Sequence, residues 1–206
     1  MRAISWIATT AALASVTAPV AGAAGRPIQL AQALQSQPAA AARQSRALPV
    51  FEIAQSGVSL QTGDTWDQAG QTFRLYGVQS CIRGTNFTNA AGVKGDCGEA
   101  SLAYFSALIR DTKPRCTAIA RSGSPPVIYS VCAAHVGKTT LDLGTVLITQ
   151  GFAFAAIDAN GKPINFQYAV AESDAQKNKR GLWAARDLPY PNTILMRAAG
   201  GSAGVR

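Results

Sequence analysis

Short runs of alternating apolar and polar residues dominate residues 50–78 and predict β-strands. Turn signals at QSG, TGD and QAG separate these runs. This spacing is typical of an antiparallel meander. Two later runs, RCTAIAR at 115–121 and PPVIYSVCAAH at 125–135, contain many of the β-branched and aromatic residues that strands favour, and they predict two further strands.

Apolar residues at helical spacing predict the first helix within residues 97–109. The apolar positions that share one of its faces are Leu102, Phe105, Leu108 and Ile109. Asp96 is positioned to cap this helix, which should begin near Gly98. Glu99 adds a negative charge to the first turn, where the helix dipole favours it.

Two more helices are predicted further along the chain. The segment LDLGTVLITQ, residues 141–150, should end at Gly151, because glycine readily adopts the left-handed conformation that follows many helices. The segment YAVAESDAQKNKRG, residues 168–181, carries basic residues in its last turn and ends with Gly181. An apolar element, FAFAA, lies between them.

The predicted order of elements is a group of strands, a helix, more strands and then two helices. This order favours the α+β class over parallel α/β. A five-stranded barrel with three helices fits this order. The folded domain is expected over residues 48–190. Residues 25–47 are rich in Ala and Gln and predict a disordered linker, and residues 191–206 are interpreted as a flexible tail.

Residues 1–24 have the pattern of a secretory signal peptide. Arg2 precedes an apolar segment, and AGA at 21–23 provides small residues for cleavage. A membrane anchor is the alternative, but the segment is short and rich in Ala and Thr for a span. No later segment is long and apolar enough to cross a bilayer. We therefore expect a periplasmic or secreted protein without a transmembrane segment in its mature form.

The chain has a net charge of +8, to which Arg2 is the only contribution from the signal segment. A basic surface attracts nucleic acid, acidic polysaccharide and anionic membranes alike, or simply keeps a protein soluble. The four cysteines suggest disulfides in an exported protein, and their number allows three connectivities. Their spacing does not match paired CxxC zinc ligands, and His135 is the sole histidine.

Several segments occur in an order that resembles the staphylococcal-nuclease-like (thermonuclease) family. They are TGDT at 62–65, TFRLYGV at 72–78, CGEASLAYFSALI at 97–109, LDLGTVLITQGFAFA at 141–155 and YAVAESDAQKNKRGLW at 168–183. The resemblance covers roughly residues 50–188, and it implies an OB-type five-stranded barrel with three helices. It also implies calcium-dependent hydrolysis of phosphodiesters in DNA or RNA.

The family's chemistry requires calcium held by oxygen ligands, a glutamate that activates water and two arginines that clamp the phosphate. By resemblance, Asp64 in TGDT corresponds to a metal-binding aspartate. Arg74 in FRL corresponds to the first phosphate-clamping arginine. Calcium is therefore the cofactor to expect if the nuclease activity persists, and no cofactor otherwise.

The chain departs from the family where the motif DAPE or DTPE is usual. QSCI stands there instead, so the metal-binding aspartate falls on Gln79, a backbone-ligand position on Ser80 and the catalytic glutamate on Ile82. The family's second arginine falls on Pro126 or Val127, and Arg121 lies several residues away from that position. Loss of a general base typically costs about 10²–10⁴-fold in rate.

Three acidic residues in the same general region could in principle replace the missing groups: Asp67, Asp96 and Glu99. Without such a replacement, the resemblance implies a framework for a nuclease site that lacks its working carboxylates. Similar exported relatives also imply the disulfides Cys81–Cys97 and Cys116–Cys132. A structural role for both is favoured over a redox role because neither pair has CxxC spacing.

Three hypotheses for function follow. The first is an exported pseudo-nuclease that acts as a polyanion-binding or accessory module in the cell envelope, including a role in exopolysaccharide (succinoglycan) biosynthesis. The second is a calcium-dependent endonuclease or phosphodiesterase of reduced activity that uses Asp64 and Arg74. The third is a structural envelope protein without a ligand.

Overall fold

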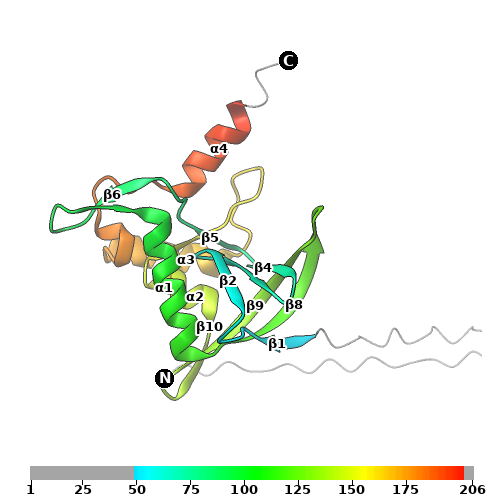
Figure 1. Ribbon diagram of the computed structural model, residues 1–206. Helices are drawn as coiled ribbons and strands as arrows, with labels where there is room; N and C mark the ends of the chain where they lie inside the picture. Colours follow the sequence, from blue (N-terminus) through cyan, green and yellow to red (C-terminus); the bar gives the residue numbers. More distant parts are fainter. Residues whose placement is uncertain (1–48, 202–206) are drawn as a thin grey trace, which may run out of the picture. The chain divides into compact units, whose positions relative to one another are not determined.

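The computed structural model describes residues 49–201. The predicted signal peptide (1–24) and linker (25–47) lie outside the described residues. Within 49–201 the protein is mixed α+β, with a curled sheet and four α-helices (Figure 1). The predicted α+β class is therefore confirmed.

The strands occupy two blocks of the sequence that are separated by the longest helix. They are β1 (Val50–Glu52), β2 (Val58–Thr62), β3 (Thr65–Gln68), β4 (Gln71–Leu75), β5 (Val78–Ser80), β6 (Asn86–Thr88), β7 (Lys94–Asp96), β8 (Arg115–Ser122), β9 (Val127–Val136), β10 (Thr139–Asp142) and β11 (Ala153–Ala155). The helices are α1 (Cys97–Thr112), α2 (Leu143–Thr149), α3 (Phe166–Lys177) and α4 (Pro191–Gly201), with a 3₁₀ turn η1 at Gly181–Ala184.

The main sheet has seven strands in the order β1-β8-β9-β4-β3-β2, with β10 paired to β9. Strands β2, β3 and β4 form the predicted meander, and β8 and β9 form a long antiparallel pair. The two halves join where β4 runs parallel to β9, with Arg74 opposite Tyr129. β5 leaves the main sheet and pairs with β11 instead. This departure places Ser80 of β5 within hydrogen-bonding distance of Asp64, in the turn between β2 and β3.

The core lies between the curled sheet and helices α1, α2 and α3. Its aromatic part is a chain of rings from Phe51 through Phe73 and Trp66 to Phe105. Trp66 and Phe105 are fully buried, and Phe105 comes from the face of α1 that the sequence predicts to be apolar. Burial of large apolar side chains is the main favourable term that holds the helices onto the sheet.

Local signals in the sequence set the ends of the first two helices. The Asp96 carboxylate accepts a hydrogen bond from the backbone N–H of Glu99, so it caps α1 as predicted. Asp142 caps α2 in the same way, and Gly151 follows that helix with a φ of 77°, in the left-handed region. These contacts confirm the predicted start of α1 and the predicted end of α2.

Three segments differ from the prediction. Residues 83–96 contain a small hairpin of β6 and β7 that the sequence patterns do not predict, and the backbone N–H of Thr88 donates to Asp187 Oδ1. After α3 the first residue with positive φ is Lys179, two positions before the predicted Gly181, which also has a positive φ. Residues 191–201, which the sequence places in a tail, form helix α4. Its start is anchored by Asn192, whose side chain donates to the Ala155 carbonyl.

Candidate functional site

Asp64 lies in the tight turn between β2 and β3, and only 2% of its surface is exposed. Two neighbouring hydroxyls donate to its Oδ1: Thr62 Oγ1 at 2.5 Å and Thr65 Oγ1 at 2.9 Å. Gly63 allows the turn to approach α1, because a Cβ at this position would overlap Ser101. The sequence TGDT thus forms a turn that holds one carboxylate inside the protein.

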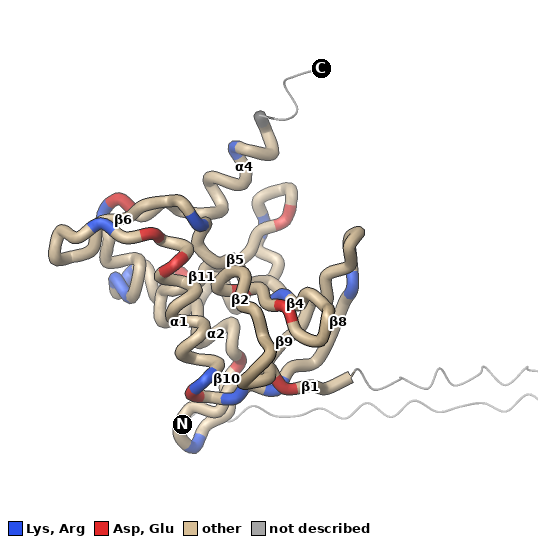
Figure 2. Tube along the Cα trace, in the orientation of Figure 1, with Lys and Arg blue, Asp and Glu red and all other residues tan. Residues whose placement is uncertain are grey.

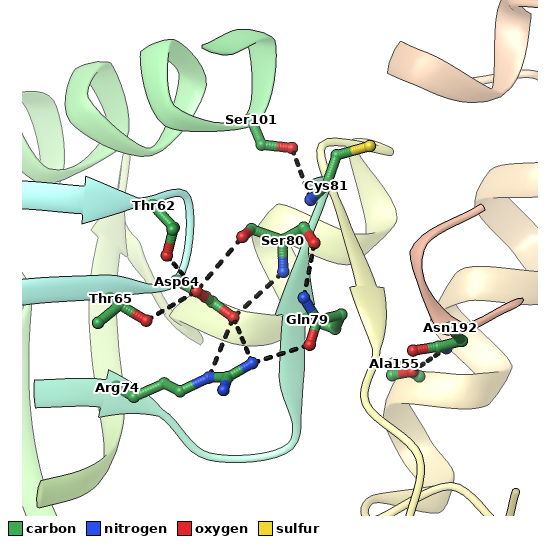
Figure 3. A network of polar contacts seen from close by, with 10 residues as sticks. All are labelled: Thr62, Asp64, Thr65, Arg74, Gln79, Ser80, Cys81, Ser101, Ala155 and Asn192. Carbon is green, nitrogen blue, oxygen red and sulfur yellow. Dashed lines mark hydrogen bonds and ion pairs between the residues drawn. The ribbon is translucent and has the colours of Figure 1, made fainter. Parts of the chain in front are cut away.

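Arg74 extends from β4 towards this carboxylate (Figure 3). Its Nε and Nη2 atoms both donate to Asp64 Oδ2, at 3.2 and 3.1 Å. About a third of the Arg74 side chain is exposed, whereas Asp64 is buried, so the pair sits at the boundary between core and solvent. The two residues are ten positions apart and meet because β3 and β4 are hydrogen-bonded neighbours.

Strand β5 completes the network with two consecutive residues. Ser80 donates to Asp64 through its backbone N–H (3.2 Å to Oδ2) and its hydroxyl (3.3 Å to Oδ1). Gln79 Oε1 accepts from Arg74 Nη2 at 2.8 Å, and its Nε2 donates to the Ser80 carbonyl (Figure 3). Gln79 therefore neutralises no charge, but it fixes the orientation of the guanidinium.

These contacts saturate the hydrogen-bonding capacity of the Asp64 carboxylate. Each of its oxygens accepts three hydrogen bonds, one of the six through the Ser80 backbone and the rest from side chains. A carboxylate offers about four lone-pair sites, so six donors saturate it. The opposite charges of Asp64 and Arg74 cancel within the network.

A pocket of about 410 Å³ opens next to the exposed side of Arg74. The Tyr76 and Tyr129 rings, which meet edge to face with their centres 6.4 Å apart, belong to its wall. Ile157 and Ile164 contribute apolar surface from the segment after β11. The pocket therefore combines one guanidinium with aromatic and aliphatic walls. None of its lining residues carries a carboxylate.

Two of the predicted degenerate positions lie in the network and two do not. Gln79 and Ser80 contact Arg74 and Asp64, as described above. Ile82 is half-buried after the end of β5, where its carbonyl accepts from the Thr85 hydroxyl. Pro126 is exposed just before β9 and does not line the pocket.

Arg121 does not supply the second guanidinium. It lies on β8 between Ala120 and Ser122, which both line the pocket. Successive side chains of a strand point to opposite faces, so the exposed Arg121 side chain leaves the sheet on the other side. The pocket has a single arginine.

The three acidic residues that could have replaced the missing groups are engaged elsewhere. Asp67 accepts from Gln61 and Thr72, Asp96 caps α1, and Glu99 pairs with Arg83 at 2.8 Å. None of them contacts Asp64 or Arg74 through any interaction between described residues. Figure 2 shows how widely the acidic residues are dispersed along the chain.

Both predicted disulfides are present. Cys81–Cys97 ties the residue after Ser80 to the first residue of α1. The Cys81 backbone N–H also donates to Ser101 Oγ on that helix, at 3.2 Å. Cys116–Cys132 joins directly opposed residues of β8 and β9. All four cysteines are almost fully buried, and the first disulfide holds β5 in place beside the network.

Sequence reasoning missed two features of the site. It treated Gln79 only as a lost metal ligand, whereas Gln79 is the second partner of Arg74. It also missed Ile157 and Ile164, which approach the pocket because Ile157 forms a bridge with Pro163. No local pattern marks either contact. Gln79 is close to Arg74 in the sequence but reaches it only through the path of β5, and Ile157 and Ile164 belong to a segment that is distant from β4 in the sequence.

Comparisons with known proteins add no identification: a scan against protein-family models gives no match, and a search of curated proteins gives no significant match. Among the helices in residues 49–201, none has the length and apolar character needed to cross a bilayer. Within the same residues, no group of three or more His, Cys, Asp or Glu side chains is arranged to hold a metal ion.

Proposed function

We propose that this chain is an exported staphylococcal-nuclease-like domain that binds an anionic polymer at Arg74 without cutting it. The proposed fold is the OB-type barrel. Three features support it: the β2–β3–β4 meander, the parallel pairing of β4 with β9, and the antiparallel return of β8. The two buried disulfides support an oxidising compartment, such as the periplasm or the exterior.

The pairing of Arg74 with Asp64 is the observation that carries the proposal. In a working site of this family, by resemblance, the aspartate would bind calcium and the arginine would hold the phosphate. Here the two side chains bind each other, and Gln79 stands where a second carboxylate would be needed. Calcium requires six to eight oxygen ligands and favours anionic ones. A single carboxylate already saturated by donors does not fit that requirement.

The pocket nevertheless retains a means of binding an anion. Arg74 uses Nε and Nη2 within the network, and the contacts between described residues leave Nη1 unused. A phosphate or carboxylate oxygen that entered the pocket could accept from this nitrogen, and a ring could rest against Tyr76 or Tyr129. Single-stranded nucleic acid provides both groups, and an acidic polysaccharide provides the anion with a sugar ring.

Binding and cleavage can be tested separately on the full chain. Labelled single-stranded DNA is titrated with the oxidised protein, and binding is followed by fluorescence anisotropy at several salt concentrations. We expect binding that weakens steeply with salt, because counterions are released when phosphates are neutralised. A second reaction with millimolar calcium is examined on a gel. Cleavage that requires both calcium and Arg74 would show an active nuclease and overturn the proposal.

Two variants of equal charge separate the pocket from the general basic surface. Arg74→Gln removes the pocket guanidinium, and Arg121→Gln removes a guanidinium from the other face of the sheet. Loss of a charged hydrogen bond corresponds to about tenfold or more in affinity, so we expect that loss only for Arg74→Gln. Tyr76→Ala alters the wall without touching the Asp64 network. Equal effects of all three variants would show that the ligand binds elsewhere.

A further inference from the structure

A second pocket, of about 380 Å³, lies between α3 and the chain that follows it. It is lined by Ala169, Glu172, Ser173, Gln176, Trp183 and Tyr190. It shares no lining residue with the pocket beside Arg74, and its chemistry is the opposite, because its only charged side chain is a carboxylate.

Glu172 is unusual for a carboxylate in that it is more than nine-tenths buried and has no cationic partner. Its Oε2 accepts from the backbone N–H of Ala155 at 3.3 Å, but its buried Oε1 has no hydrogen-bond partner. No Lys or Arg among residues 49–201 forms an ion pair with it. Burial raises the pKa of Glu172, and the interactions with the Tyr190 hydroxyl and the Ala155 backbone N–H only partly offset that rise, as expected for a carboxylate that is desolvated without a cation.

Aromatic side chains surround the same pocket. Trp183 and Tyr190 line it with ring centres 5.7 Å apart, and the buried Phe154 meets both rings edge to face, at 5.3 and 5.6 Å. The Trp183 indole N–H is buried and has no acceptor. Two unsatisfied polar atoms, one an acceptor and one a donor, therefore belong to residues that line one pocket.

These groups are complementary to a particular kind of ligand. Aromatic faces attract cations through the ring quadrupole, most strongly when the cation is desolvated, and a carboxylate adds a direct charge partner. An indole N–H needs a hydrogen-bond acceptor. We propose that this pocket binds a small organic ammonium compound that also carries an oxygen acceptor, with the ammonium against Glu172 and the rings and the oxygen near Trp183.

The proposal is independent of the function assigned to the Arg74 pocket, because the two pockets share no residue. Choline is a suitable probe, since it has a quaternary ammonium and a hydroxyl. Its neutral carbon isostere, 3,3-dimethyl-1-butanol, has the same shape and hydroxyl but no charge. Binding is measured on the full chain by the indole N–H resonances in two-dimensional NMR. The Trp183 signal is assigned by its absence in Trp183→Phe, which separates it from Trp6 and Trp66.

We expect choline to shift the Trp183 resonance saturably, and the isostere to bind about tenfold more weakly or not at all. The Glu172→Gln variant keeps the shape and an acceptor for Ala155, and it should remove the preference for choline. Glu52→Gln, on an exposed strand, is the matched control and should bind choline like the native chain. Equal binding of both probes, or no response to choline, would overturn the proposal. Because the two probes are compared on the native chain, this comparison does not depend on Glu172→Gln folding.

Discussion

The pairing of Asp64 with Arg74 gives a sharp prediction about stability. Replacing Arg74 with Met keeps an unbranched side chain of similar length on β4 but leaves the carboxylate without its cation. Asp64 is 2% exposed, so solvent cannot reach it freely to compensate. Removing one partner of a buried ion pair typically costs about 3–5 kcal/mol.

Two features of the structure reduce this cost. Four of the six hydrogen bonds to the carboxylate come from Thr62, Thr65 and Ser80 and would remain. The Arg74 side chain is one-third exposed, so part of its charge is already screened by water. We therefore expect Arg74→Met to lower the free energy of unfolding by about 2–3 kcal/mol. For a chain of this size that corresponds to a drop in Tm of about 4–12 °C.

Urea denaturation of the native chain and the variant, followed by circular dichroism, measures the change directly. Arg121→Met is the control, because it removes the same charge from an exposed position and should change stability by less than about 0.5 kcal/mol. The double variant Asp64→Asn with Arg74→Met completes a thermodynamic cycle, and it should be less destabilised than the sum of the single variants. A loss of stability as small as that of Arg121→Met would show that the pair does not hold the site together.

Three further changes probe other parts of the structure. Replacing Cys116 and Cys132 together with Ala should lower the free energy of unfolding by about 3 kcal/mol, measured by urea denaturation, because each disulfide closes a loop of 16 residues. Gly151→Ala should destabilise the chain far more than Gly57→Ala in thermal denaturation. Both residues have positive φ, but a Cβ would overlap backbone only at Gly151, and equal losses would contradict this steric argument. The pKa of Glu172 is raised by burial, so its protonated form stabilises the fold, and that contribution is complete below its unfolded pKa and declines as pH rises towards its folded pKa. The neutral Glu172→Gln variant should therefore gain stability relative to the native chain as pH rises in a series of unfolding experiments, and a loss of relative stability with rising pH would contradict the assigned direction.

Local sequence determined the parts of this protein whose physics is local. The positions of α1 and α2 follow from their caps, since Asp96 and Gly151 act within one turn of the helix that each one bounds. The strands of the meander follow from alternation and from turn residues. The disulfide pairs followed from resemblance to exported relatives, not from the spacing of the cysteines, which allows three connectivities.

Only the tertiary structure decided how the site works. Whether Asp64 meets a metal ion or a guanidinium depends on the register of β3 against β4 and on the path of β5, and both are set by contacts across the sheet. Arg121 lies between two residues that line the pocket, Ala120 and Ser122. The alternation of side chains along β8 therefore directs its charge to the face of the sheet away from the pocket. Helix α4 was not predicted, because its first turn depends on the bond from Asn192 to a strand 37 residues away in the sequence. Such contacts are specified by packing between distant segments, and no short stretch of sequence encodes them.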